Sequence, residues 1–119
     1  MEGTTSSSGS ARSQILAHLR TLRASLAQAR DALMHFKEDR HDRDKLEPAA
    51  RRVDDLMDMF ASTLRDPVRG CVWVIEIQNG VDQVTNPKAA DALRRARIDI
   101  AALLDVLGSE ESGTYGSIN

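Results

Sequence analysis

The sequence predicts an all-α protein: an antiparallel helical hairpin, a short apolar segment and a C-terminal helix, associating as a dimer. Hydrophobic residues make up 41% of the 119 residues and aromatic residues only 3%, so the core must consist of aliphatic side chains, which favours helices over a β-sandwich. Apolar residues also recur at helical spacing along the chain. A chain of this length forms one modest core, at a size where oligomers often supply missing burial.

The segment from Ser13 to Phe36 carries the clearest helical pattern. Its apolar residues alternate spacings of four and three, which is typical of a helix that packs lengthwise on another helix. Ser10 or Ser13 is a suitable N-cap. The apolar stripe consists of Ile15, Leu19, Leu22, Leu26, Ala29, Leu33 and Phe36.

A polar link, KEDRHDRD at residues 37–44, separates this helix from a second one. Asp44 and Glu47 resemble a capping box, which places the start of the second helix there. The helix is expected to end at Asp66, because Pro67 disfavours α conformation in the residue before it. Its stripe consists of Leu46, Ala49, Val53, Leu56 or Met57, Phe60 and Leu64. Two matching stripes and a short link predict an antiparallel hairpin.

The segment that follows Pro67 is apolar, and two structures fit it. One is a short buried helix over residues 68–78, because apolar residues recur there at helical spacing. These residues are Val68, Cys71, Val72 and Ile75. The other is a β-hairpin over 71–85, with a type I′ turn at an Asn-Gly pair. A lone two-stranded hairpin is marginal unless a helix covers it, which slightly favours the short helix.

The last helix has clear start and stop signals. Asn86 is a suitable N-cap, a proline follows at the first helical position, and Gly108 suits the C-cap. Its stripe consists of Leu93, Ala96, Ile100, Leu103 and Leu107. A single helical domain is therefore expected over 11–108, between disordered tails at 1–10 and 109–119 that lack apolar periodicity.

Composition and motifs exclude several classes of function. With 16 basic and 18 acidic residues, the net charge of −2 does not indicate a nucleic-acid binder by bulk charge. Cys71 is the single cysteine, and neither a signal peptide nor a membrane span is recognisable, so a cytoplasmic protein is expected. His35 and His41 are six apart, on different helix faces, and no catalytic, cofactor or metal motif occurs. We therefore expect no enzyme, no cofactor and no metal.

The first helix carries a row of cations. Arg23, Arg30 and Lys37 are seven residues apart, so they lie in line beside the apolar stripe. Such a row has a geometry that can follow phosphates. The same positions also commonly hold interhelical ion pairs, for which Asp54 and Asp58 are suitable partners. The pattern leaves both interpretations open.

The stretches FASTLRDPVRGCVWVIEIQNG at 60–80 and KAADALRRARIDIAALLDVL at 88–107 resemble the small helical RNA-silencing suppressor of insect nodaviruses. In that family a long second helix ends in a Ser/Thr-Leu pair, two residues and Pro, before a short apolar segment closing at Gly and a charged final helix. The resemblance implies a homodimer that lies along double-stranded RNA and reads A-form shape rather than sequence. It implies that the dimer shields RNA from dicing and small-RNA loading, beside contacts with host silencing proteins in the host cytoplasm.

The resemblance places RNA contacts mainly on the first helix, because Asp55 and Asp58 stand where the family has basic residues on later turns of the second. The expected RNA-binding residues are Arg20, Arg23, Arg30, Lys37, Arg51 and Arg52. The expected dimer or core contacts are Leu22, Leu26, Phe60 and Trp73. The alternative is a helical adaptor or subunit that docks a protein partner through its apolar stripes and binds no nucleic acid.

Overall fold

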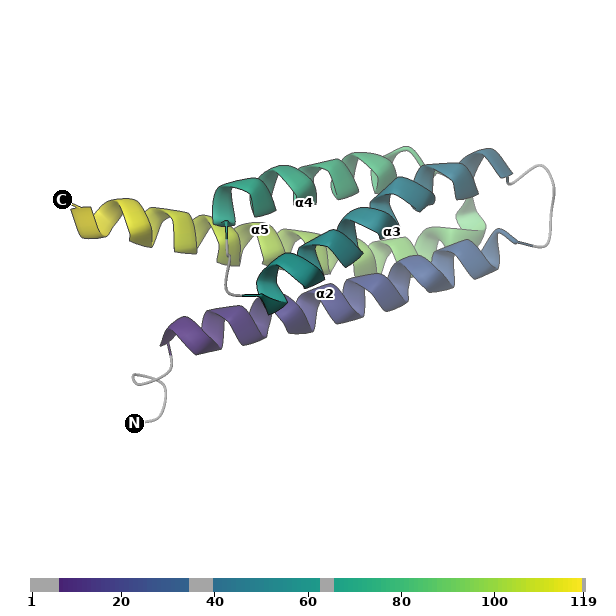
Figure 1. The fold of residues 1–119 in the computed structure, drawn as a ribbon. Coiled ribbons are helices and arrows are strands. Elements are labelled where there is room, and N and C mark those ends of the chain that lie inside the picture. Colours follow the sequence, from purple (N-terminus) through teal and green to yellow (C-terminus); the bar gives the residue numbers. More distant parts are fainter. Residues whose placement is uncertain (1–6, 35–39, 63–65, 119) are drawn as a thin grey trace.

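The computed structural model describes residues 7–34, 40–62 and 66–118, with side chains from residue 11 to residue 109 of these ranges. The described residues form helices and no strand, which confirms the predicted all-α fold. The helices are α2 (Ser7–Ala32), α3 (Arg40–Ala61), α4 (Pro67–Asp82), the 3₁₀ helix η2 (Pro87–Ala89) and α5 (Ala90–Ile118) (Figure 1).

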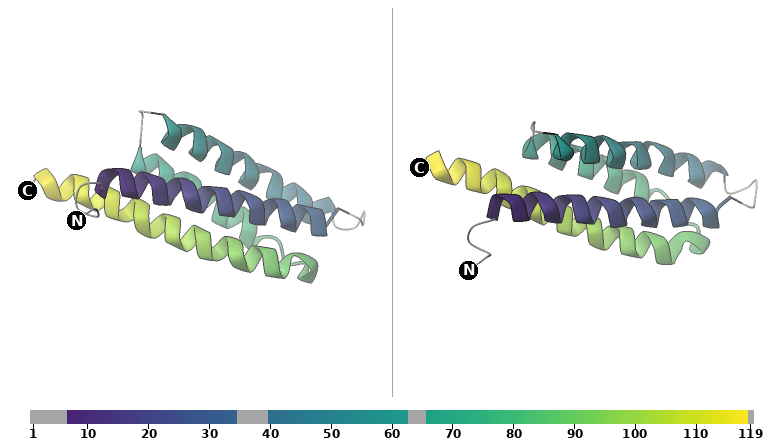
Figure 2. Two further views of the ribbon diagram at one scale, coloured as in Figure 1. Left: turned by 90° about the horizontal axis from the view of Figure 1, so that it is seen from below. Right: turned by 60° about the horizontal axis from the view of Figure 1, so that its bottom comes forward.

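The four long helices form an antiparallel bundle in which consecutive helices run in opposite directions (Figures 1 and 2). α2 packs on α3 and α5, and α4 packs on the same two helices, so α2 and α4 lie diagonally across the bundle. Short links between consecutive helices favour this order, because each helix can then pack on its neighbours along its whole length. The predicted hairpin of the first two helices is one half of the bundle, and α4 and α5 complete it.

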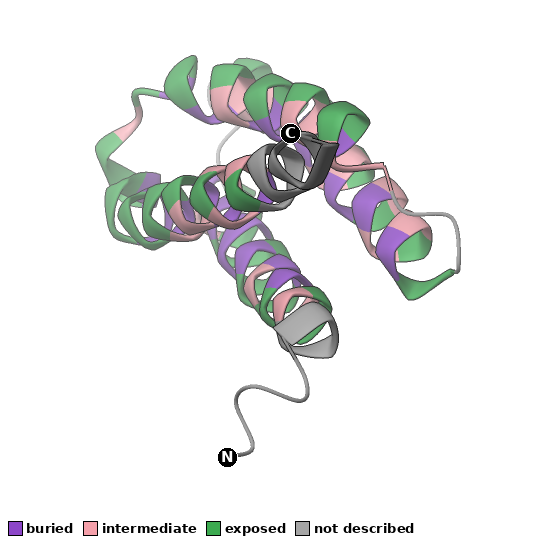
Figure 3. Ribbon diagram, turned by 90° about the vertical axis from the view of Figure 1, so that its left-hand side faces the viewer, coloured by how far each residue is buried: buried purple, intermediate pink, exposed green. Residues whose placement is uncertain are grey.

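The predicted stripes of α2, α3 and α5 face one another inside the bundle, where buried residues line the interior (Figure 3). Every described member of the three stripes is buried. At the position for which the sequence left Leu56 and Met57 open, Leu56 is buried and Met57 is only partly buried. Phe36 and Leu64 lie outside the described residues. The core on α2 and α3 consists of Ile15, Leu19, Leu22, Leu26, Ala29, Leu33, Leu46, Ala49, Val53, Leu56 and Phe60.

The predicted start of the second helix is wrong. α3 begins at Arg40, so the Asp44 and Glu47 pair lies inside the helix instead of capping it. Its first turns are stabilised across the link, because Arg43 donates through Nη1 to the carbonyl oxygens of Leu33 and Met34, at 3.3 and 3.0 Å. Leu33 and Met34 directly follow α2, where the helix no longer supplies main-chain donors to their carbonyl oxygens.

The predicted end of the second helix is also wrong. α3 ends at Ala61, and Asp66 is the N-cap of α4. Its Oδ1 accepts a hydrogen bond from the main-chain nitrogen of Arg69 at 3.0 Å, and Pro67 occupies the first turn, where its missing N–H costs nothing. The Asp-Pro pair therefore starts a helix.

α4 is a helix of 16 residues, so the β-hairpin alternative for residues 71–85 is wrong. The outcome also corrects the predicted orientation of the helix. The predicted stripe lies on the half-buried and exposed side of α4. The residues that face the core are instead Gly70, Val74, Ile77 and Val81. Spacing could not decide between the two sides, because α4 is apolar on both.

The start of the last helix agrees with prediction, and its end does not. Oδ1 of Asn86 accepts a hydrogen bond from the main-chain nitrogen of Lys88 at 2.9 Å, and the first turn is the 3₁₀ helix η2. α5 continues through Gly108 to Ile118, so residues 109–118 are helical where the sequence suggests a tail. A capping glycine takes a positive φ, whereas no described glycine has one, and no proline follows to stop the helix.

Candidate functional site

The predicted row of cations on α2 lies against the acidic residues of α3. Arg30 Nη1 is 2.9 Å from Glu47 Oε2. Arg23 Nε is 3.7 Å from Asp54 Oδ1, as the ion-pair interpretation expects, and its Nη1 is 3.7 Å from the Met57 sulfur. Lys37 lies outside the described residues. The described part of the row is therefore an interhelical ion-pair ladder.

The outer surface of α2 and α3 has nearly balanced charge. The exposed arginines on these two helices are Arg12, Arg20, Arg23, Arg30, Arg40 and Arg51. The exposed carboxylates on the same described surface are Asp31, Asp44, Glu47, Asp54 and Asp58. Interspersed charges of opposite sign give a weak net field, whereas a phosphate-binding face concentrates positive charge.

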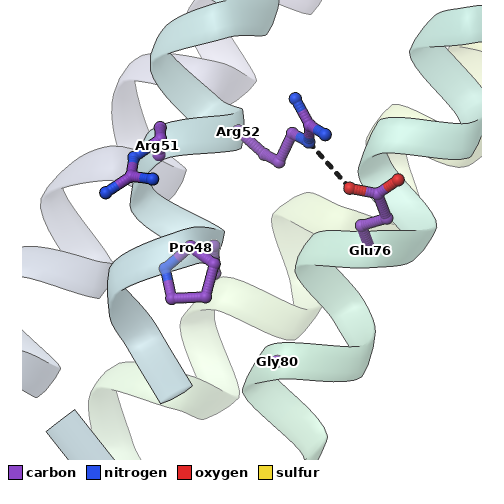
Figure 4. Close-up of a pocket in the computed structure, with 6 residues that line it drawn as sticks. Pro48, Arg51, Arg52, Glu76 and Gly80 are labelled. Carbon is purple, nitrogen blue, oxygen red and sulfur yellow. Dashed lines mark hydrogen bonds and ion pairs between the residues drawn. The ribbon is translucent and has the colours of Figure 1, made fainter. Parts of the chain in front are cut away.

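Arg52 links α3 to α4 (Figure 4). Its Nε donates to Glu76 Oε1 at 2.7 Å, and its Nη1 donates to Asp55 Oδ2 at 3.1 Å. Its guanidinium carbon lies 5.0 Å from the centroid of the Trp73 ring, a cation–π distance. The hydrogen bond to Glu76, with that to Asp55, raises the pKa of Arg52 above its ordinary value. The side chain is thus held at three points and covers one face of the indole.

A surface hollow of about 340 Å³ lies beside this cluster, between α3 and α4. It is lined by Pro48, Ala49, Arg51, Arg52, Glu76 and Gly80. In Figure 4 Arg52 points across the hollow to Glu76, whereas the Arg51 side chain points away from Glu76. Of the described charged groups that line the hollow, Arg52 and Glu76 neutralise each other in an ion pair, so Arg51 is the one lining charge left for an ionic ligand.

The predicted dimer or core contacts lie in the core of the single chain or at its edge. Leu22, Leu26 and Phe60 are almost inaccessible, and Trp73 is half-buried against the core. The Leu22 and Leu26 side chains are therefore covered by the chain's own helices. The described members of the α2, α3 and α5 stripes therefore offer no apolar surface to a partner.

Among the described residues, the exposed large apolar side chains gather on α4. Val68, Val72 and Ile75 are 47%, 51% and 46% exposed, and they occupy positions i, i+4 and i+7 of the helix. We call these three residues the α4 stripe; at 1.5 Å per residue it is about 10 Å long. Met34, in the turn after α2, and Ile98, on α5, are also exposed. The α4 stripe is thus a continuous row, whereas the others are single side chains.

Sequence reasoning missed the α4 stripe as a surface because it assigned those residues to the core. A signal was present: α4 carries apolar residues on both sides, which is typical of a helix covered on both sides. Of the described helices, α3 and α5 pack on it. The side that bears the α4 stripe therefore has the composition of an interface and no covering helix among the described residues.

Other chemistry finds little support in the described residues. No set of three or more His, Cys, Asp or Glu side chains there can hold a metal ion. No described helix combines the length and apolar character needed to cross a membrane. Comparison with known proteins found no family model that matches the chain, and no curated protein and no solved structure matches it. The candidate site is thus defined by geometry alone, as an apolar helix face.

Proposed function

We propose that this protein is a helical association module that docks a helix of another protein chain along the α4 stripe, without catalysis. The observation that carries the proposal is the row of Val68, Val72 and Ile75, each about half exposed, on a helix whose opposite side is already in the core. Burying the remaining apolar surface of such a side chain contributes on the order of 1 kcal/mol each. A partner helix at this position would give α4 the two-sided burial that its composition suits.

The geometry of the α4 stripe suits a helical partner. Apolar residues at i, i+4 and i+7 form a straight ridge, and such a ridge packs into the groove of an adjacent helix. Polar and charged side chains border the ridge, among them Arg69 and Glu76. An apolar centre with a polar rim is the usual anatomy of a protein interface.

Binding of double-stranded RNA, with silencing suppression as its consequence, is the second candidate. It is favoured by Arg20 and Arg51, which are exposed and have no acidic partner among the described residues. The ion pairs of Arg23 and Arg30 weigh against it, because each phosphate contact there would first have to displace a carboxylate. The charge balance of the α2–α3 surface weighs in the same direction.

Site-specific photocrosslinking tests the proposed docking. A benzophenone side chain replaces Val72 in the full-length protein, produced in the cells that naturally make it. The matched control carries the same group at Ala24, which is exposed on α2, the helix diagonal to α4. We expect adducts with another polypeptide, either a second copy or a different chain, from position 72 and not from position 24. Equal labelling from both positions, or none from position 72, would refute the proposal.

A gel-shift titration with a short RNA duplex tests the second candidate. Wild type is compared with Arg23→Glu/Arg30→Glu, and with Glu47→Gln, which releases Arg30 from its ion pair. If the α2 row binds phosphates, Glu47→Gln tightens binding, the double variant loses it, and affinity falls steeply with salt. If wild type shows no shift at low salt, duplex RNA binding is excluded and the docking function is unaffected.

A further inference from the structure

We infer that the helix docked on the α4 stripe is α4 of a second copy of this chain, antiparallel to the first, about a twofold axis that passes near Val72. The inference rests on the proposed function and names its partner. A twofold interface uses the same patch on both copies, so the patch must be complementary to itself when reversed. Both the apolar residues and the charges of α4 meet this condition.

The apolar residues match their own reversed order. Val68 lies four residues before Val72, and Ile75 lies three residues after it. When two copies of α4 run antiparallel with the Val72 residues at the same level, Val68 of one copy falls within one residue of Ile75 of the other, an axial offset of about 1.5 Å. The three exposed side chains then meet three exposed side chains with no polar residue between them.

The charges match in the same register. Arg69 and Glu76 are seven residues apart, so they lie on the same flank of the α4 stripe, and both are exposed. In an antiparallel pair of helices equal flanks face each other, which brings Arg69 of each copy beside Glu76 of the other. A parallel pair would instead bring that flank against the opposite one, which carries Cys71 and Gln78 and no charge to match.

The carboxylate that this pairing needs has room for a second partner. Arg52 of the same chain bonds to Oε1 of Glu76, which leaves Oε2 for the second copy. Arg69 Nε is 3.8 Å from Asp66 Oδ2, a loose contact between exposed groups that can be exchanged at low cost. The interface would thus extend the ion-pair cluster around Trp73, while Asp66, the N-cap of α4, would keep its hydrogen bond from the main-chain nitrogen of Arg69.

The expected dimer is weak. An apolar row about 10 Å long, with its rim, forms an interface at the small end of the range, and such interfaces have dissociation constants around the micromolar level. Sedimentation equilibrium over a wide concentration range measures it. We expect the average mass of wild type to rise towards twice that of one chain, and Val72→Glu to remain a monomer. Ile98→Glu, which places the same charge at an exposed isoleucine on α5, should dimerise as wild type does.

The charge pairing has its own control. Arg69→Glu places like charges opposite each other at both ends of the interface, and it should weaken the dimer by about tenfold. Arg94 also pairs with an acidic residue three positions before it on an exposed helix surface, so Arg94→Glu is the matched control and should leave the dimer unchanged. Circular dichroism establishes that each variant keeps its helices. Equal effects of Arg69→Glu and Arg94→Glu would contradict the register.

Disulfide cross-linking determines the orientation. In a Cys71→Ala background, a mixture of the Val68→Cys and Ile75→Cys chains should cross-link in pairs under mild oxidation, and Val68→Cys alone should not. Cross-linking of Val68→Cys with itself would overturn the antiparallel arrangement. This experiment needs no charged substitution on α4, so it remains decisive if Val72→Glu unfolds.

The outcomes separate this inference from the proposed function. A protein that stays monomeric at all concentrations, while position 72 captures a different chain in cells, refutes self-association and retains docking. A monomer with no adduct at position 72 refutes both. A dimer that survives Val72→Glu shows that the copies associate through another surface, which refutes the inference.

Discussion

Gly80 of α4 lies against the main chain of Lys45 in α3: a Cβ at position 80 would be 3.1 Å from the Lys45 carbonyl oxygen. The same atom would lie 3.4 Å from the Cβ of Ala49. Glycine is therefore favoured at this position by the close approach of two helices, and not by a turn. The Asn79-Gly80 pair that suggested a hairpin lies within α4 instead.

Replacing Gly80 by valine should destabilise the bundle. The branched side chain must either push α4 away from α3 or displace a main-chain carbonyl, and overpacking of this kind costs about 1–3 kcal/mol. Urea unfolding followed by circular dichroism measures the change in the free energy of unfolding. An unchanged unfolding midpoint would show that α3 and α4 do not approach this closely.

Gly108 provides the opposite case, because a Cβ there would meet nothing within 4 Å. In the interior of α5, Gly108→Ala should raise the free energy of unfolding by about 0.5–1 kcal/mol, since alanine loses less conformational entropy in a helix. If α5 instead ended at a glycine of positive φ, the same substitution would destabilise. The sign of the change therefore tests whether the helix continues towards Ile118.

The sequence was sufficient to predict the orientation of a helix that has apolar residues on one side only, because that side must face the core. The stripe from Ile15 to Leu33 on α2 has a single apolar side, so its orientation was predicted correctly. It was insufficient for α4, where Val72 and Val74 belong to opposite sides and only packing on α3 and α5 selects Val74 for the core. The Asn-Gly signal at Gly80 was misleading in a similar way: glycine commonly marks a turn, but here it allows two helices to pack closely.

The candidate site could not be predicted either, because its contacts depend on how the helices pack on one another. Whether Arg30 faces solvent or a carboxylate depends on the register between α2 and α3, which sequence spacing does not specify. The contact of Arg52 with Trp73 and Glu76 depends on how α4 is rotated, and that rotation was not predicted. An exposed stripe on α4 is recognisable only after its other side has been placed in the core.

Arg43 should contribute measurably to the joint between α2 and α3. Its guanidinium bonds to the carbonyl oxygens of Leu33 and Met34, so Arg43→Met leaves those acceptors without this partner. We expect the free energy of unfolding to fall by about 1–2 kcal/mol. Arg20→Met is the control, because Arg20 is exposed on α2 with no described partner, and it should change stability by less than about 0.5 kcal/mol.

A substitution at Leu22 tests whether the α2 stripe lies in the core of one chain or at an interface between chains. Because Leu22 is fully buried within one chain, Leu22→Ala should lower the free energy of unfolding by about 2–5 kcal/mol. Val72→Ala removes a comparable apolar group from the exposed α4 stripe and should cost less than about 0.5 kcal/mol in the monomer. Chemical unfolding at a dilute protein concentration compares the two. Little loss of stability in Leu22→Ala, together with loss of dimer, would place the α2 stripe at an interface instead.

The contact between Arg52 and Trp73 can be followed directly, since Trp73 is the single tryptophan of the chain. The guanidinium over the indole shields one ring face from water, so Arg52→Ala should increase acrylamide quenching of the fluorescence and shift the emission to longer wavelength. Arg51→Ala is the matched control: Arg51 is the adjacent residue on α3, and it points away from Glu76 (Figure 4). Its emission should equal that of wild type. If both variants change the emission equally, the effect reflects general loosening of α3, and the specific arrangement of Arg52 over Trp73 is wrong.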